Sequence, residues 1–257
     1  MIKTVNGLKI NYCEKGDGKL VVLLHGWGSN ISLFTSLIEL ISKKYKAVAM
    51  DMPGFGGSDE PPEPWCVDDY VDFVLDFLKD YDTKDVIFLG HSFGGRVIIK
   101  MLSRSNLPFA ASKVILTGSA GVLPKKSFKQ RFRLKIYKMT KSILLSAPIK
   151  KLFPNALESL RRRNGSADYN AASPVMRQSL VKVVNEDLVP LLGKITPPTL
   201  LVWGRNDTAT PIADGELMES LMPNAALTVL EHSGHYAFLD EMFAFNKIAA
   251  SFLEIEE

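Results

Sequence analysis

The stretch that decides the fold spans residues 86–99 and reads VIFLGHSFGGRVII. Four apolar residues lead into a Gly-x-Ser-x-Gly pattern, and a second apolar run follows it. This order predicts a buried strand that turns sharply into a helix, with Ser92 in strained backbone geometry at the apex of the turn. Gly90 and Gly94 flank the apex and allow neighbouring backbone to pass close by. The hydroxyl of Ser92 is therefore expected to stand exposed beyond the end of the strand.

Strands and helices alternate on both sides of this stretch. An Asn-Gly pair between residues 2–5 and 8–12 is typical of a two-residue hairpin turn. Apolar runs that end in turn residues predict buried strands at 20–24, 47–50, 86–89, 114–117, 200–204 and 227–230. Apolar residues at helical spacing predict helices near 33–41, 67–81 and 97–102, another after Pro211, and a last one that ends at Phe252. The alternation requires crossover connections. It predicts an α/β fold with a mostly parallel sheet, helices on both faces and an N-terminal antiparallel hairpin.

The alternation lapses between residues 121 and 195. This segment carries sixteen Lys and Arg against four Asp and Glu, a net +12, which leaves −9 on the rest of the chain. We therefore expect residues 1–120 and 196–257 to form the core and residues 121–195 to form a helical insertion. Residues 125–143 predict a basic amphipathic helix, and Ser173 before a proline predicts the start of a second helix over 175–184.

Composition excludes several classes of protein. No run of about eighteen apolar residues is present, so no membrane span is expected. The N-terminus lacks the apolar stretch of a secretory signal, which favours a cytoplasmic location. Two cysteines and four histidines without metal-ligand spacing predict neither a disulfide framework nor a metal site. No dinucleotide fingerprint or phosphate loop is found, so we expect no cofactor and no nucleic-acid partner.

A serine hydroxyl becomes a nucleophile only with a general base that a buried acceptor orients. Asp207 follows the strand at 200–204 and His235 follows the strand at 227–230. Because the carboxyl ends of parallel strands meet at one edge of a sheet, both are expected near Ser92. Asp187 and Asp214 are the alternatives to Asp207.

Five short motifs at the ends of successive strands carry a family resemblance. They are residues 25–28 (HGWG), 51–58 (DMPGFGGS), 90–95 (GHSFGG), 204–207 (GRND) and 233–235 (SGH). In this order they resemble the α/β-hydrolase family, whose catalytic residues run Ser, Asp, His. The resemblance implies that Ser92, Asp207 and His235 form a catalytic triad and that the backbone N–H groups of Trp27 and Phe93 form the oxyanion hole. It also implies that residues 121–195 are a cap over a substrate pocket, for which we expect Trp27, Phe93, Phe128, Phe132 and Tyr236.

The resemblance implies a serine hydrolase that cleaves a small or medium carboxylic ester through an acyl-enzyme on Ser92. One alternative is a C–C bond hydrolase that acts on a carboxylate-bearing diketone, although members of that branch usually carry Asn where His91 stands. Another alternative is a ligand-binding receptor with a vestigial triad. The expected partner is a small molecule, anionic or apolar, and the sequence leaves the oligomeric state open.

Three interpretations of the basic insertion compete. In the first, its charges are solvated while an apolar stripe packs on the core, which is the usual arrangement of a surface helix. The helix at 125–143 also has the composition of a helix that binds an anionic membrane surface. Finally, its charge would attract an anionic substrate.

Overall fold

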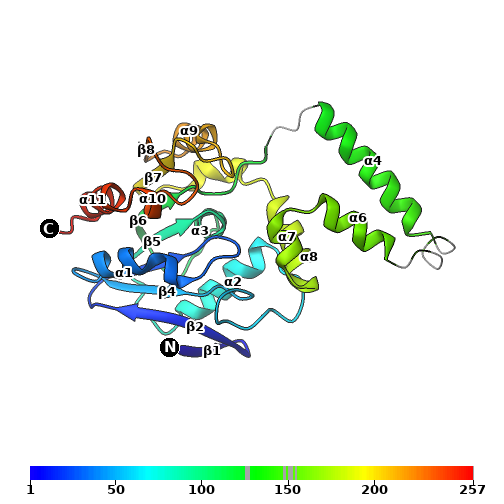
Figure 1. Ribbon diagram of the computed structural model, residues 1–257. Helices are drawn as coiled ribbons and strands as arrows, with labels where there is room; N and C mark the ends of the chain where they lie inside the picture. The colour runs from blue at the N-terminus through cyan, green and yellow to red at the C-terminus, as the bar shows by residue number, and fades with distance from the viewer. Residues whose placement is uncertain (125–127, 147–148, 150–152, 154, 257) are drawn as a thin grey trace.

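The central feature of the computed structural model, which describes residues 1–124, 128–146, 149, 153 and 155–256, is an eight-stranded sheet (Figure 1). The strands are β1 (Ile2–Val5), β2 (Leu8–Lys15), β3 (Leu20–Leu24), β4 (Lys46–Met50), β5 (Val86–His91), β6 (Ala111–Thr117), β7 (Thr199–Gly204) and β8 (Ala225–Leu230). Their order across the sheet is β1-β2-β4-β3-β5-β6-β7-β8. The β1–β2 hairpin is antiparallel and β2 pairs antiparallel with β4, whereas every pairing from β4 to β8 is parallel. The predicted α/β fold is confirmed.

Helices cover both faces of the sheet. One face carries η1 (Ile31–Phe34), α1 (Thr35–Ile41), α10 (Ala237–Asp240) and α11 (Met242–Leu253), and the other carries α2 (Val67–Leu78), α3 (Phe93–Leu102) and α9 (Ile212–Leu221). Side chains of β3 alternate between the two layers, with Val21 in one buried cluster and Val22 in the other. Coverage of both faces explains why the central strands are apolar throughout.

Three element boundaries differ from the sequence predictions. Helix α3 begins at Phe93, four residues before the expected start, because the turn at Ser92 leads directly into it. Helix α2 ends at Leu78, and Tyr81 is reached through a turn in which its N–H donates to Leu78 O (3.0 Å). The last helix is divided at Glu241 into α10 and α11.

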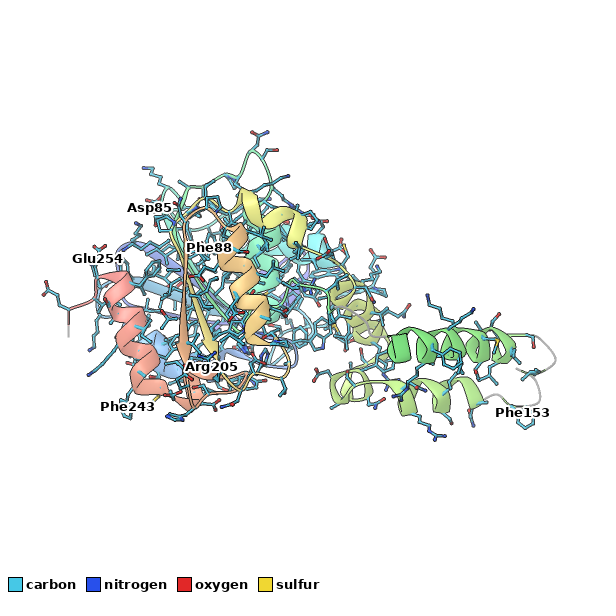
Figure 2. All side chains as sticks on the ribbon, turned by 90° about the horizontal axis from the view of Figure 1, so that it is seen from above. Asp85, Phe88, Phe153, Arg205, Phe243 and Glu254 are labelled. Carbon is cyan, nitrogen blue, oxygen red and sulfur yellow. The ribbon has the colours of Figure 1, made fainter. Side chains whose placement is uncertain are left out.

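The segment between β6 and β7 forms two parts. It contains α4 (Phe128–Leu144), α6 (Ala156–Asn164), α7 (Ala167–Ala171), α8 (Pro174–Val184) and η2 (Val189–Lys194). Ser173 caps α8 as predicted, since its Oγ accepts from Met176 N (3.2 Å). Met176 and Val183 are buried in the same cluster as α2 and α3, so α8 packs on the core. Helices α4 and α6 instead project away from it (Figure 1 and Figure 2).

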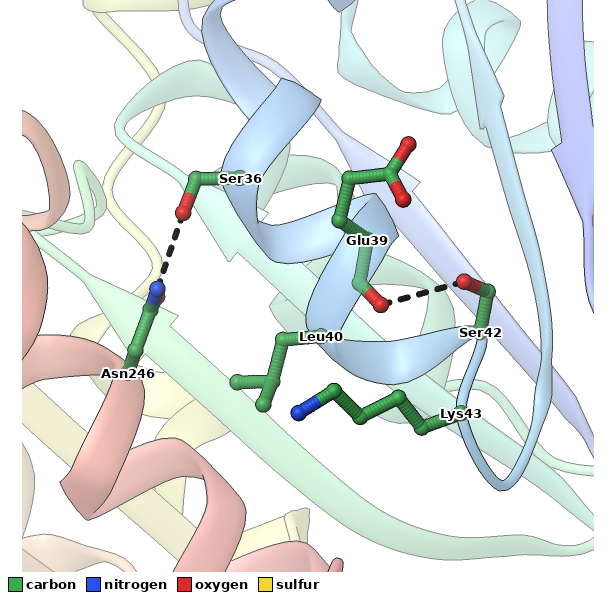
Figure 3. A pocket seen from close by; sticks show the side chains of 6 residues that line it. All are labelled: Ser36, Glu39, Leu40, Ser42, Lys43 and Asn246. Atoms are coloured by element: carbon green, nitrogen blue, oxygen red, sulfur yellow. Dashed lines mark hydrogen bonds between the residues drawn. The ribbon is translucent and has the colours of Figure 1, made fainter. Parts of the chain in front are cut away.

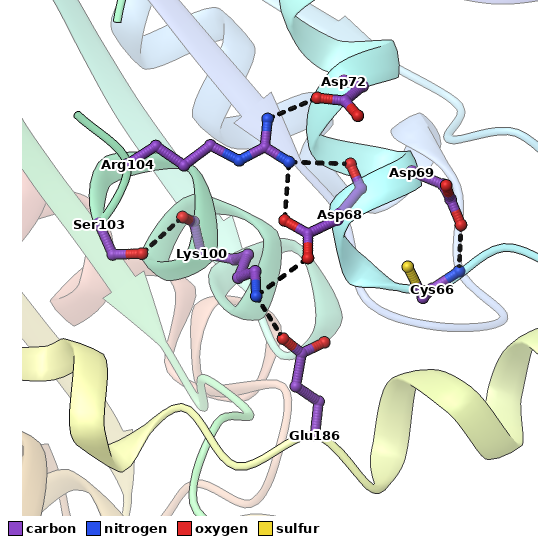
Figure 4. A network of polar contacts seen from close by, with 8 residues as sticks. All are labelled: Cys66, Asp68, Asp69, Asp72, Lys100, Ser103, Arg104 and Glu186. Carbon is purple, nitrogen blue, oxygen red and sulfur yellow. Dashed lines mark hydrogen bonds and ion pairs between the residues drawn. The ribbon is translucent and has the colours of Figure 1, made fainter. Parts of the chain in front are cut away.

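The segment after α8, in which the insertion leads back to the sheet, is held against the core by ion pairs and a hydrogen bond. Lys100 Nζ contacts Glu186 Oε1 (2.6 Å) and Asp68 Oδ2 (3.0 Å), which joins α3, α2 and the segment after α8 (Figure 4). The guanidinium of Arg96, which is 4% exposed, donates to the backbone oxygen of Glu186. These contacts fix α8 and the return segment, and leave α4 and α6 as the projecting part.

None of the described helices is long and apolar enough to cross a bilayer.

Candidate active site

The candidate nucleophile occupies a strained turn between β5 and α3. Ser92 has φ 50° and ψ −108°, a backbone conformation that costs a non-glycine residue about 1–3 kcal/mol. A Cβ on Gly94 would lie 1.9 Å from Leu24 O, and one on Gly90 would lie 2.7 Å from Gly95 N. Both positions therefore exclude any side chain, and the close packing around the turn holds Ser92 in place.

The candidate base and its acid lie after neighbouring strands. Asp207 follows β7 and His235 follows β8, and His235 Nδ1 lies 2.8 Å from Asp207 Oδ2. The ionised carboxylate can only accept, so Nδ1 carries the imidazole proton. Nε2 of His235 is then the free acceptor that a general base requires.

Local backbone and side-chain groups fix the Asp207 carboxylate. Oδ1 accepts from the N–H groups of Ala209 (2.8 Å) and Thr210 (2.9 Å), and Oδ2 also accepts from Thr210 Oγ1 (2.8 Å). Burial by itself raises the pKa of Asp207, but the hydrogen bonds from His235 and Thr210 outweigh burial and leave this pKa below its usual range. Asp207 is thus ionised at neutral pH and orients His235.

Neither alternative carboxylate contacts His235 in the described part of the chain. Asp187 is exposed and lies just before η2, where its Oδ1 accepts from Val189 N (3.2 Å). Asp214 lies in the first turn of α9, where burial and then the charge of Asp207 raise its pKa. Of the three candidate acids, the structure places only Asp207 against His235.

His91 links Ser92 to His235, because it precedes Ser92 in the chain and contacts His235. The rings of His91 and His235 lie 4.8 Å apart, and His91 Nε2 donates to the backbone oxygen of His235 (3.0 Å). Among the described residues, no hydrogen bond joins Ser92 to His235. Such hydrogen bonds are often long in unliganded enzymes and shorten when substrate binds. The structure thus brings the three residues to one edge of the sheet.

His91 is a buried, neutral histidine. Its Nε2 carries the proton because its acceptor is a carbonyl, while its Nδ1 faces Gly26 and has no partner among the described residues. Burial, reinforced by the nearby His235, lowers the pKa of His91 to about 3. His91 therefore acts as a structural donor that positions the His235 loop.

His91 is expected to make the protein less stable in acid. Between pH 6.5 and 3 an unfolded histidine binds a proton that folded His91 does not, so the free energy of unfolding falls as pH falls. At pH 5 this term amounts to about 2 kcal/mol. Urea denaturation at pH 7.5 and at pH 5 should show that the His91→Asn variant loses about 2 kcal/mol less than the wild type. The exposed His232, changed to Asn, is the control and should keep the wild-type dependence; equal losses in all three proteins would contradict the assignment.

Two backbone donors lie beside Ser92. Phe93 is the first residue of α3, and Trp27 lies in the loop after β3. Their rings meet edge to face with centroids 5.3 Å apart. In the described part of the chain, no hydrogen bond uses the N–H of either residue. Two free donors next to a nucleophile can stabilise an oxyanion.

The loop that carries Trp27 is fixed by a second buried histidine. His25 Nδ1 donates to Gly26 O (2.7 Å), and its Nε2 accepts from Met52 N (2.9 Å). Burial lowers the pKa of His25, so the ring stays neutral and holds the loop in place through its two hydrogen bonds.

A cavity of about 370 Å³ opens beside this loop, between residues 54–60 and helices α7 and α8. Its lining includes Trp27, Phe55, Glu60, Asp168, Ala172 and Met176. Its described lining contains two carboxylates and no Lys or Arg. Sequence reasoning missed Phe55 and Met176, although Phe55 lies within the 51–58 motif and Met176 follows the predicted helix start at Ser173.

The structure places the expected pocket residues in different surroundings. Trp27 lines the cavity, and the ring of Phe93 packs against the ring of Trp27. Tyr236 is 37% exposed and packs on His91, with ring centroids 4.9 Å apart. Phe132 is 58% exposed on α4 and does not line the cavity, because α4 projects from the core. The side chain of Phe128 lies outside the described part of the chain.

A second hollow of about 470 Å³ lies between α1 and α11 (Figure 3). It is lined by Ser36, Glu39, Leu40, Ser42, Lys43 and Asn246, and Asn246 Nδ2 donates to Ser36 Oγ (2.8 Å) across it. Ser92, Asp207 and His235 are not among the described lining residues of either hollow. Trp27, an expected oxyanion donor, lines the cavity of about 370 Å³ and not this one, so we associate that cavity with the candidate site at Ser92.

Comparisons with known proteins agree with this fold. A family model described as alpha/beta hydrolase fold matches residues 19–242. The pimeloyl-(acyl-carrier protein) methyl ester esterase of Nitrosomonas europaea is 24% identical over 238 residues, which are 87% of this chain and 91% of the relative. The structure of the esterase EaEST from Exiguobacterium antarcticum is 26% identical, with a TM-score of 0.74 and 98% of each chain covered. The meta-cleavage product hydrolase CumD from Pseudomonas fluorescens IP01 has a TM-score of 0.72 at 23% identity, with 99% of this chain and 97% of that chain covered.

Proposed function

This chain belongs to the α/β-hydrolase fold family, and on that premise we propose that it is a serine hydrolase of small or medium carboxylic esters. The observation that carries the proposal is the strained turn that presents Ser92 at the sheet edge where Asp207 holds His235. The backbone conformation of Ser92 costs free energy, and the contact with Asp207 fixes the orientation of the His235 ring. Together they match the needs of nucleophilic acyl transfer.

In the proposed reaction, His235 Nε2 takes the proton from Ser92 Oγ as this oxygen attacks the ester carbonyl. The N–H groups of Trp27 and Phe93 stabilise the oxyanion of the tetrahedral intermediate. His235 then gives the proton to the leaving alcohol, and an acyl-enzyme remains on Ser92. Water, activated by the same histidine, releases the acid and restores the serine.

The cavity favours an uncharged substrate over an anionic one. Glu60 and Asp168 line it, and none of its described lining residues is a cation, so a carboxylate-bearing substrate would meet repulsion there. The remaining lining is largely aromatic, small or thioether, which suits an apolar acyl or alcohol group. Two of the similar proteins are esterases, which supports an ester as the substrate class.

A series of p-nitrophenyl esters with increasing acyl length tests the substrate class. We expect hydrolysis of short and medium esters and a decline for long ones, because the cavity holds about 370 Å³. Ala172→Phe fills part of this space and should lower kcat/KM for medium esters roughly tenfold while sparing the acetate.

Ala167→Phe is the matched control, since Ala167 lies exposed on α7 and does not line the cavity. Failure of the wild type to hydrolyse any ester of the series would refute the esterase proposal. An unchanged chain-length profile in Ala172→Phe would instead remove this cavity from the proposal.

A further inference from the structure

Helix α4 carries an exposed row of apolar side chains. Phe132, Ile136, Met139 and Ile143 are 58%, 44%, 60% and 51% exposed. Their spacing of four, three and four residues confines them to an arc of roughly 60° around the helix axis. In a surface helix such a row normally faces the core. Here it faces solvent, so packing on the core, the first interpretation of the insertion, does not account for it.

Cations border this row on both sides. Arg133 lies beyond one edge, whereas Lys135 and Lys138 lie beyond the other, and all three are exposed. None of the three forms an ion pair in the described part of the chain. Residues 125–157 contain ten Lys and Arg and no Asp or Glu. The surface is thus apolar along its centre, cationic along its margins and free of opposing charge.

The position of the row separates it from the candidate active site. Helices α4 and α6 project from the core, and Phe153 stands at the far end of this projection, opposite Phe243 on the core (Figure 2). Phe153 is 62% exposed and adds to the apolar surface at the tip. Among the described residues, no Lys or Arg lines the cavity beside Trp27, so none of the described cations of the insertion serves that cavity.

We infer that α4 docks on the surface of an anionic phospholipid bilayer. Its apolar row would enter the boundary between headgroups and acyl chains, and its flanking cations would contact lipid phosphates. A protein partner would need an apolar groove with acidic residues along both margins. An anionic bilayer supplies both features, since lipid phosphates lie on either side of the docked helix and acyl chains lie beneath it. Charge complementarity and the central apolar row together select the bilayer as the occupant. This inference does not rest on the proposed function.

Cosedimentation of the full chain with lipid vesicles tests the inference. The protein should bind phosphatidylcholine vesicles that contain phosphatidylglycerol roughly tenfold more tightly than vesicles of phosphatidylcholine alone. High salt should weaken binding, because it screens the electrostatic attraction between the cations of α4 and the lipid phosphates. Absence of binding to the anionic vesicles at low salt would overturn the inference.

Matched variants locate the binding surface. The pair Ile136→Ser and Met139→Ser should weaken binding to anionic vesicles roughly tenfold, and so should Lys135→Gln with Lys138→Gln. Phe243→Ser is the control: this residue is 81% exposed on α11, at the opposite end of the molecule, and its loss should leave binding unchanged. The thermal midpoint of each variant confirms that it is folded.

Two results would contradict the inference even if the wild type binds. One is that both α4 variants bind anionic vesicles as tightly as the wild type does. The other is a self-associated protein in which the Ser variants convert the oligomer to monomer without changing vesicle binding, since the row would then contact a second copy. Ser92→Ala should bind vesicles like the wild type, so failure of the esterase proposal and failure of this inference can be told apart.

Discussion

Ser92→Ala should lower ester hydrolysis by about 10⁵- to 10⁶-fold and abolish labelling by a fluorophosphonate. The acyl-enzyme cannot form without the hydroxyl, and the remaining groups can only bind the ester and stabilise an oxyanion generated by water. Alanine also removes a polar side chain without adding bulk, so the packing around Gly94 and Leu24 should remain. The measurement is kcat/KM on the best ester of the series, together with labelling followed by mass spectrometry.

Ser103→Ala provides the control for this change. Ser103 ends α3, where its Oγ donates to Lys100 O (2.8 Å), and it belongs to the same helix as the nucleophile turn. It should retain wild-type activity and labelling. Labelling of Ser92→Ala at the wild-type rate would show that the reactive serine lies elsewhere.

Asp207→Asn is expected to lower kcat by about 10⁴-fold with little change in KM. The N–H groups of Ala209 and Thr210 point at Oδ1, so the amide oxygen should occupy that position and the amide nitrogen should face His235. An amide N–H there turns His235 Nδ1 into an acceptor and moves the imidazole proton to Nε2. His235 then cannot take a proton from Ser92.

Asp214→Asn separates the role of the acid from the loss of any nearby carboxylate. Asp214 is close enough for the charge of Asp207 to raise its pKa, but it makes no contact with His235 in the described structure. This control should keep activity within a fewfold of the wild type. A larger loss in Asp214→Asn than in Asp207→Asn would reverse the assignment of the acid.

The architecture could be predicted from the sequence because its signals are local. A buried strand covered on both faces must be largely apolar, as β3 is along its whole length and β5 and β7 are apart from His91 and Thr199 at their ends. The turn at Ser92 was predictable because Gly90 and Gly94 are needed wherever backbone passes so close. Boundaries such as the end of α2 at Leu78 were less accurate, since turns stabilised by tertiary packing override helical spacing.

The candidate site was only partly accessible to sequence reasoning. The order of Ser92, Asp207 and His235 and their places after strands predicted a common edge of the sheet, which is where the structure has them. The place of Asp207 after a strand favoured it over Asp187 and Asp214. Only the structure gives its contact with His235, because that contact is a distance of 2.8 Å between atoms of two separate loops. The cavity residues Phe55 and Met176 were missed for the same reason, since they come from segments far apart in the chain.

The sequence by itself determined the α/β fold, the strained turn at Ser92 and the concentration of positive charge in residues 121–195. Each of these is a property of composition, spacing or local backbone requirement, and none depends on knowing which distant residues meet. Only the tertiary structure decided that Asp207 holds His235, that carboxylates rather than cations line the cavity, and that the apolar row of α4 faces solvent. Those properties depend on how separate segments pack, because burial and short contacts arise only when distant parts of the chain come together.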